Sequence, residues 1–134
     1  EGVFGYDEKG SNIFMRLKNS PGQFPVAIDQ FSQPIYAGEL AKLVMGLLEK
    51  GQRGIFNATG KDYVSRYEFC RKVIERFDMK VELKPFSVND RQIKVPQYLK
   101  VDVAKVEKVL PRPIMGLESQ LNDLEKIGDE LGQN

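Results

Sequence analysis

The sequence contains no histidine and only one cysteine, Cys70. The absence of histidine removes the side chain that most often acts as a general base or as a metal ligand. A zinc site would have to be built almost entirely from carboxylates, which is unusual for that metal, so we expect no metal centre. A single cysteine excludes a disulfide within the chain and favours a cytoplasmic protein.

The two charge signs are nearly balanced, and long apolar runs are absent. The chain has 20 Lys and Arg residues against 19 Asp and Glu residues, a net charge of +1. So small an excess predicts neither a nucleic-acid surface nor an anionic membrane as a partner. The most apolar stretch, residues 40–48, is interrupted by Lys42 and Gly46 and is too short to span a bilayer. We therefore expect neither nucleic acid nor membrane among the partners.

The length of 134 residues, with 41% hydrophobic and 29% charged side chains, fits one globular domain with its own core. The chain begins at Glu1 without a methionine and reaches the apolar segment Val3-Phe4-Gly5 at once. Natural N-termini are more often polar. Two interpretations stay open on this feature: a piece of a longer protein, or a chain that lacks a tag or its initiator methionine.

Short apolar segments alternate with helical patterns along the chain. In the first half, the predicted elements are strands at 3–5 and 26–28, a short helix at 12–18, an extended piece at 35–36, a helix at 38–50 and a buried strand at 54–58. In the second half they are a helix at 65–77, a half-buried strand at 80–84, a polar irregular segment at 87–97, a helix capped by Asp102, and a last helix from about 115 or 116.

The helix start at Ser65 is the most clearly marked of these. Ser65 and Glu68 have the spacing of a capping box, and Val64 and Phe69 stand at the two positions of a hydrophobic staple. The alternation of strands and helices predicts an α/β fold with some parallel pairing. Only three or four strands are expected, and all are short. Such a set suits one side of a larger sheet with a small helical lobe.

Several segments, taken in order, resemble the dTDP-4-dehydrorhamnose reductase branch of the extended short-chain dehydrogenase/reductases. Val3-Phe4-Gly5 is similar to the V-[YF]-G of that family, and residues 29–41, DQFSQPIYAGELA, are similar to its D-Q-x-G-x-P-T-Y-x-x-D-L-A. Residues 54–60 and 65–69 are similar to its G-x-[YF]-[HN]-x-x-G and S-x-[YF]-E-[FL]. The matching positions of its R-P-x-x-x-x-L-D-x-x-K are Pro96, Val101, Asp102 and Lys105.

The resemblance implies the C-terminal part of a Rossmann-type extended fold, with a few short strands and four or five helices. Residues 1–134 would form a single substrate-binding region, and the N-terminal dinucleotide-binding part would be absent. The parent protein would use NAD(P)H to reduce a nucleotide-linked 4-keto-6-deoxyhexose, as in rhamnose biosynthesis. The implied substrate-binding residues are Asn12, Phe14, Arg16, Gln30, Pro34, Tyr36 and Pro96, and the implied cofactor-binding residues are Val3 and Gly5.

For several of these residues the pattern allows two interpretations. Asp29 and Gln30 could line the nucleotide-sugar pocket, or could form a turn in which Asp29 bonds its own backbone. Phe14 could pack on a base and Arg16 could bind phosphate, or Phe14 could belong to the core of a solvated helix. Cys70 lies on the apolar side of its helix and is expected in the core.

The chain departs from the family pattern at two positions. Ile35 replaces a Thr, and Val95 replaces the Arg before Pro96, a residue suited to a diphosphate because a guanidinium binds phosphate bidentately. Arg91 and Lys94 are close enough in sequence to take its place.

The catalytic residues of the family are absent from the sequence. There is no glycine-rich dinucleotide turn. Tyr67 and Arg71 only approximate the Y-x-x-x-K pair, and their helix explains both residues. We expect no catalytic residue here, no tight NAD(P) binding by this chain alone, and no activity without the rest of the protein. A non-catalytic regulatory module and an epimerase fragment remain alternatives, and a homo-oligomer is possible.

Overall fold

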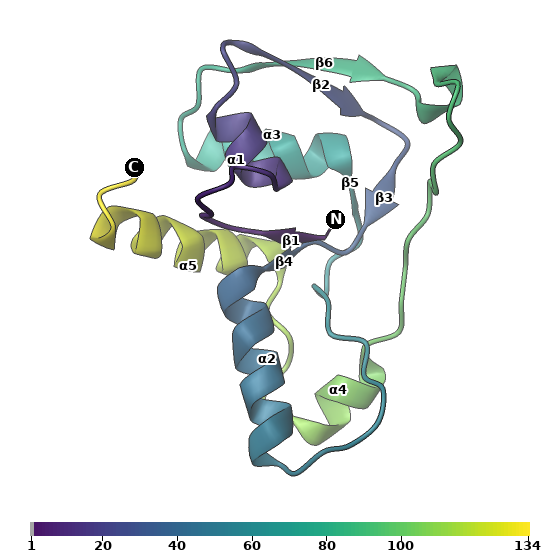
Figure 1. Cartoon of the computed structure of the whole chain (residues 1–134), viewed down its shortest axis with the longest axis vertical. Coiled ribbons are helices and arrows are strands. Elements are labelled where there is room, and N and C mark those ends of the chain that lie inside the picture. The colour runs from purple at the N-terminus through teal and green to yellow at the C-terminus, as the bar shows by residue number, and fades with distance from the viewer. Residues whose placement is uncertain (1) are drawn as a thin grey trace.

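The computed structural model describes residues 2–134. The described part contains helices and short strands that alternate along the chain, as Figure 1 shows. The strands are β1 (Val3–Phe4), β2 (Gln23–Ala27), β3 (Phe31–Ser32), β4 (Ile35–Tyr36), β5 (Val64–Ser65) and β6 (Glu82–Phe86). The helices are α1 (Ile13–Lys18), α2 (Ala37–Glu49), α3 (Arg66–Arg76), the short 3-10 helix η1 (Val88–Asp90), α4 (Ala104–Val109) and α5 (Leu117–Glu130).

The strands form three separate pairs. β2 and β6 are parallel over their full length, from Gln23 opposite Glu82 to Ala27 opposite Phe86. β1 and β4 are parallel over two residues, and β3 and β5 are antiparallel. The predicted α/β class with parallel pairing is therefore confirmed. The small β3–β5 pair was not predicted, because two-residue strands carry too little periodic pattern to be read from sequence.

Two apolar clusters hold the fold together. The larger lies among α1, α3, α5 and the strands β1 and β2, and includes Phe4, Leu17 and Leu121. The smaller lies where α2 faces α4, and contains Leu43, Val106 and Ile114. In Figure 1, α2 extends away from the first cluster with α4 beside it, so these two helices form a lower lobe.

The helix ends follow the chemistry of their capping residues. The Ser65 hydroxyl accepts from the backbone N–H of Glu68 at 3.0 Å, as the capping box predicts. Asp102 stands one residue before the N-cap of α4, yet its carboxylate accepts from the N–H of Ala104 at 2.8 Å. The first N–H of α5, from Leu117, donates to the carboxylate of Asp62 at 2.6 Å. That cap comes from 55 residues earlier, so no local pattern could predict it.

The prediction of a buried strand at 54–58 was wrong. The segment has no regular structure, and Ile55 is 86% exposed. Its polar groups pair with side chains and backbone of the α4 region. Lys105 Nζ donates to the Ile55 carbonyl at 2.7 Å, and Asn57 Nδ2 donates to the Asp102 carbonyl at 3.1 Å. An apolar run becomes a strand only when a neighbouring strand can pair with it, and none does so within residues 2–134.

Candidate functional site

Two adjoining hollows open between α1, the start of α3 and the β2–β6 pair. The first has a volume of about 240 Å³ and the second about 210 Å³. Ile13, Arg16 and Arg66 line both, so the two form one continuous depression. The second hollow adds the strand residues Phe24 and Phe86, and a further wall from Gln30, Arg91 and Val95.

Three arginines, Arg16, Arg66 and Arg91, meet at the second hollow. Among the described residues that line it, none is acidic. Two of the guanidinium groups lie over aromatic rings. Arg91 Cζ is 4.4 Å from the centroid of the Phe86 ring, and Arg16 Cζ is 5.7 Å from that of Phe24. Stacking orients a planar guanidinium while leaving its N–H edges available, so the arrangement is suited to bind an anion.

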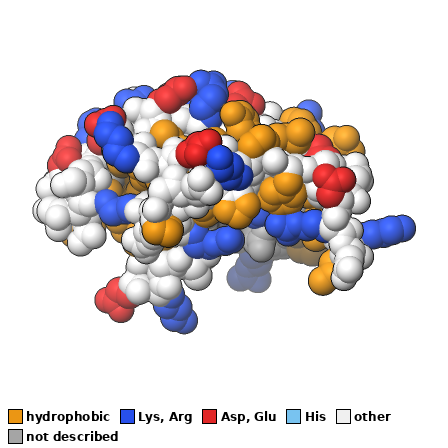
Figure 2. Space-filling model, turned by 90° about the horizontal axis from the view of Figure 1, so that it is seen from above, with side chains coloured by type: hydrophobic (Ala, Val, Ile, Leu, Met, Phe, Trp, Pro, Cys, Tyr) orange, Lys and Arg blue, Asp and Glu red, His pale blue; other side chains and the backbone are white. Residues whose placement is uncertain are grey.

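The surface above the β2–β6 end has the mixed character that such a site requires. Seen from this end, exposed apolar side chains lie among Lys, Arg, Asp and Glu side chains (Figure 2). The walls of the second hollow repeat this mixture, because Val26, Ala27 and Val95 stand beside the arginines. A ligand with an anionic centre and less polar ends therefore matches the lining better than a simple inorganic ion.

Asp29 holds the segment that carries Arg91. Its carboxylate accepts from the Ser87 hydroxyl at 2.5 Å, from the Val88 N–H at 2.9 Å and from Gln97 Nε2 at 3.3 Å. The Ser87 hydroxyl and the Val88 N–H lower the pKa of Asp29, because they stabilise the ionised carboxylate. The two predicted roles, lining the pocket and bonding its own backbone, omit these contacts, through which Asp29 holds residues 87–97 beside the hollow.

We expect Asp29→Asn to loosen residues 87–97, because an amide offers an N–H where the carboxylate accepts from Ser87 and Gln97. Amide hydrogen exchange in this segment should rise by roughly tenfold. Asp90→Asn removes the same charge from an exposed position and is the matched control. Because the pKa of Asp29 is lowered from 3.8, wild-type protection should persist above that pH and disappear only as the pH falls through the lower, folded-state value. Equal exchange in both variants would contradict this role.

Three of the predicted substrate-binding residues line the depression. Arg16 borders both hollows, and Gln30 borders the second, where its Nε2 donates to the Pro96 carbonyl at 3.3 Å. Asn12 borders the first. Its side chain also stabilises the fold. Oδ1 caps α1 by accepting from the Met15 N–H at 3.2 Å, and Nδ2 donates to the Gly5 carbonyl at 2.8 Å.

Phe14 belongs to the core, the second of the two interpretations that the sequence allowed. It is 0% exposed and stands edge-on to both Tyr6 and Phe77. A ring enclosed on both sides offers no face to a nucleotide base. The two faces of helix α1 thus differ: Phe14 lies on the side that packs in the core, and Arg16 lies on the side that lines the depression.

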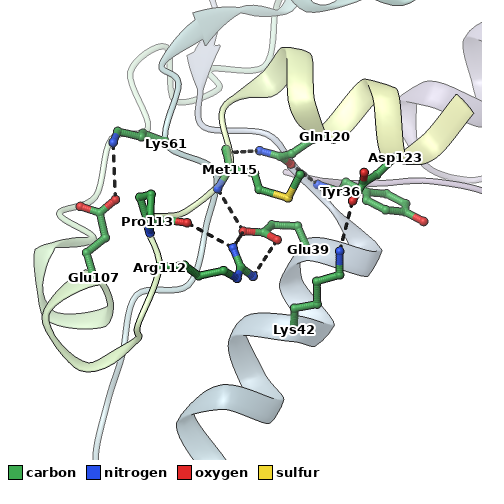
Figure 3. Close-up of polar contacts among 10 residues, drawn as sticks. All are labelled: Tyr36, Glu39, Lys42, Lys61, Glu107, Arg112, Pro113, Met115, Gln120 and Asp123. Carbon is green, nitrogen blue, oxygen red and sulfur yellow. Dashed lines mark hydrogen bonds and ion pairs between the residues drawn. The ribbon is translucent and has the colours of Figure 1, made fainter. Parts of the chain in front are cut away.

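Tyr36 lies apart from the residues of the depression. Its N–H donates to Gln120 Oε1 at 2.6 Å, and Figure 3 shows its ring beside Lys42 and Asp123, on the side of α2 and α5. Burial raises the pKa of its phenol, so it stays protonated at neutral pH. In the described structure Tyr36 supports the start of α2 and does not line either hollow.

The two prolines have different positions. Pro34 is buried, and its carbonyl lies directly against Gly60. It borders a small third hollow that shares Ile13 and Arg66 with the larger two. Pro96 is exposed and touches the site only through its carbonyl, which accepts from Gln30. Pro34 therefore acts through packing, and Pro96 through its backbone.

The predicted cofactor residues supply little of a dinucleotide site. Val3 is 44% exposed and borders the first hollow. Gly5 is buried, with φ of 148°, and its carbonyl is already engaged by Asn12. Residues 2–134 contain no glycine-rich turn between a strand and a helix that could hold a pyrophosphate. The residues present do not fit NAD(P) on their own.

Arg66 was missed, although the sequence carries a signal for it. It follows the N-cap Ser65 and begins α3, where the helix dipole disfavours a positive charge. A cation at that position costs stability, so it indicates a role beyond the helix. The Tyr67 and Arg71 pair shows no such signal. Arg71 pairs with Glu75 one turn later, and Tyr67 packs against the larger core cluster.

The described residues lack two further kinds of feature. None of the helices in this part of the chain has the length and apolar character needed to cross a membrane. Residues 2–134 also hold no group of three or more His, Cys, Asp or Glu side chains placed to bind a metal ion.

A family model described as the RmlD substrate binding domain matches residues 2–127. The chain belongs to this family. A comparison with curated proteins gave no match. The family assignment agrees with the resemblance seen in the motifs around Val3, Asp29, Gly54 and Ser65.

Solved structures of larger proteins share this fold. A dTDP-4-dehydrorhamnose reductase from Clostridium acetobutylicum matches with a TM-score of 0.81 and 18% identity, over 96% of this chain and 47% of that one. The Bacillus anthracis enzyme in complex with NADP matches with a TM-score of 0.74 and 21% identity, over 94% and 46%. A hypothetical dTDP-4-dehydrorhamnose reductase from Sulfolobus tokodaii gives 0.66 and 25%, over 90% and 43%. This chain thus spans less than half the length of these proteins.

Proposed function

We propose that residues 1–134 form the substrate-binding region of an NAD(P)H-dependent nucleotide-sugar reductase, and that the depression holds the diphosphate of the nucleotide sugar. The observation that carries this proposal is the meeting of Arg16, Arg66 and Arg91 in one hollow. Membership in the RmlD substrate binding domain family and the likeness to reductases support the same class of ligand.

The chemistry of the hollow explains why a diphosphate fits. A nucleoside diphosphate carries several negative charges on adjacent phosphates, and guanidinium groups bind such oxygens in pairs. The apolar residues Ile13, Val26 and Val95 border the same space and could contact the less polar sugar or base. Arg91 reaches the hollow from the loop that contains Val95, so it replaces the arginine that the family pattern places before Pro96.

The departure at Ile35 does not favour a non-catalytic module. Ile35 is 1% exposed and packs in the smaller core cluster with Leu43 and Val106. A threonine hydroxyl at this position would face the core and not a ligand. Arg91 supplies the guanidinium from another position in the sequence, and the side chain at position 35 packs in the core. Both departures from the family pattern are therefore compatible with substrate binding.

The reduction itself would require a second portion of the parent protein. NAD(P)H supplies the hydride in such reactions, and the residues described here do not hold that cofactor alone. We therefore assign to this chain the binding and orientation of the nucleotide sugar, with hydride transfer left to the portion that the relatives have in addition. A cytoplasmic location agrees with the single cysteine of the sequence. Burial raises the pKa of the Cys70 thiol to about 12, so the thiol is inert.

Calorimetric titration with dTDP and UDP tests this proposal. We expect Arg91→Ala and Arg16→Ala each to weaken binding about tenfold, because each removes a charge-assisted hydrogen bond. Lys84→Ala is the matched control: it removes one positive charge from β6, where Lys84 pairs with Glu82 outside the hollow. The nucleosides thymidine and uridine, which lack phosphate, should bind far more weakly. Equal losses for Lys84→Ala and Arg91→Ala, or no binding of either diphosphate, would contradict the site.

A further inference from the structure

The chain between η1 and α4 contains a short segment beside the second hollow, Gln92–Val95, which we call the strap. The strap forms no helix or strand, and Figure 1 shows the chain from η1 to α4 as an extended stretch along one side of the molecule. Arg91, directly before the strap, and Val95, at its end, both line the second hollow. The residues between them therefore lie along the rim of the hollow.

The chain on both sides of the strap is fixed by the same carboxylate. Before the strap, Asp29 accepts from the Val88 N–H at 2.9 Å, and after it from Gln97 Nε2 at 3.3 Å. The Gln97 carbonyl also accepts from the Phe31 N–H at 2.6 Å. With both ends held in this way the strap cannot move away as a whole, so its natural motion is a swing about its two ends.

The middle of the strap has no polar partner in the described part of the chain. Among residues 2–134, no hydrogen bond or ion pair involves Gln92, Ile93 or Lys94. Ile93 is 77% exposed, and Lys94 is exposed as well. An isoleucine in water gains free energy when its side chain is covered. A ligand that fills the hollow offers Ile93 a surface to cover.

The charges around the hollow explain why the strap stays open without a ligand. Lys94 has the same sign as Arg16 and Arg91, and residues 91–97 contain no acidic side chain. Closing the strap would exclude water from between these cations, and like charges repel more strongly where the effective dielectric constant is low. An anion with several negative charges in the hollow reverses this balance. Lys94 is then attracted toward the hollow, where before it was repelled.

We infer that the strap is a lid that closes over the second hollow when a diphosphate binds there, with Ile93 lying over the ligand. Repulsion of Lys94 by Arg16 and Arg91 holds the lid open, and neutralisation by the anion lets it close. This inference rests on the proposed function, because it requires an anion in the hollow. It adds a charge-dependent movement, which excludes water from the bound ligand and slows its release.

Thiol labelling tests the closure, because the buried Cys70 is unreactive and an introduced cysteine is then the reactive thiol. In the variant Ile93→Cys, we expect saturating dTDP to slow the reaction with the uncharged reagent iodoacetamide about tenfold, since the closed lid protects the side chain. Ile55→Cys is the matched control. Ile55 is 86% exposed and lines neither hollow, so its variant should react at the same rate with and without dTDP.

Substitution of Lys94 tests the role of charge in the closure. Lys94→Ala, combined with Ile93→Cys, should remove at least about half of the protection by dTDP, because the strap no longer carries the charge that the anion attracts. Lys94→Arg keeps the charge and should keep the protection. Lys84→Ala removes a positive charge that pairs with Glu82 outside the hollow, and should leave the protection unchanged.

The outcomes separate the lid from the site beneath it. If calorimetry shows that dTDP binds but the labelling rate of Ile93→Cys is unchanged, the lid is overturned and the anion site stands. Full protection in the presence of Lys94→Ala would also overturn the inference, because closure would then not depend on the charge of the strap. Absence of dTDP binding would overturn the anion site and the lid together.

Discussion

Arg112→Leu should lower the free energy of unfolding by about 3 kcal/mol, because it leaves a buried carboxylate without its counter-charge. Glu39 is 0% exposed, and Arg112 meets it with both ends of the guanidinium: Nη1 donates to Oε1 at 2.8 Å and Nη2 to Oε2 at 2.9 Å (Figure 3). The N–H of Met115 also donates to Oε1 at 3.0 Å. The side chain of Arg112 is 36% exposed, so we place the loss at the lower end for a buried pair.

A second substitution separates the charge from the packing. Glu39→Gln combined with Arg112→Leu should lose less stability than Arg112→Leu alone, because a neutral amide needs no counter-charge and can still accept from Met115. Urea denaturation of the wild type, the two single variants and the double variant gives the coupling between the partners. If the double variant is no more stable than Arg112→Leu, the buried charge is not the cause of the loss.

The ion pair has a defined place in the architecture. It joins the first turn of α2 to the residues that precede α5. Gln120 adds a second link, because its Oε1 accepts from the Tyr36 N–H at 2.6 Å and its Nε2 donates to the Met115 carbonyl at 2.7 Å. Together these contacts fix the angle at which α2 leaves β4.

Gly60→Ala should lower the free energy of unfolding by about 3 kcal/mol, the upper range for overpacking. An added Cβ would stand 1.9 Å from the carbonyl oxygen of Pro34 and 2.9 Å from its carbonyl carbon. Both atoms belong to the backbone beside β4, so no side-chain rotation can relieve the clash.

Gly2→Ala is the matched control, because its Cβ would meet the Gln33 carbonyl oxygen at an ordinary 3.5 Å. Urea denaturation should show a large loss for Gly60→Ala and a small one for Gly2→Ala. Similar midpoints for Gly60→Ala and the wild type would show that the two segments can separate without cost.

The same contact accounts for two of the family motifs. Gly60 ends one motif and Pro34 stands within another, and the structure packs them against each other. Gln33 strengthens the contact, because its Nε2 donates to the Gly60 carbonyl at 3.2 Å and its Oε1 accepts from the Val101 N–H at 2.7 Å. These motif residues therefore join three distant segments, a role that the motifs alone do not reveal.

Local chemistry was enough to predict most of the elements. The capping residue Ser65, the helical spacing in α2 and the alternating pattern at the start of β6 each depend on neighbours within a few residues, so they can be read directly from the sequence. The resemblance to the dTDP-4-dehydrorhamnose reductases rests on the same kind of short patterns, and the family assignment agrees with it.

Tertiary structure decided what depends on residues far apart in the chain. The meeting of Arg16, Arg66 and Arg91, the hold of Asp29 on residues 87–97 and the pairing of Glu39 with Arg112 join positions separated by tens of residues. The segment 54–58 shows the same limit: its apolar run predicts a strand, but a strand forms only beside a partner. Side-chain type determines what a residue can bind, whereas the packing of distant elements determines which partner it reaches.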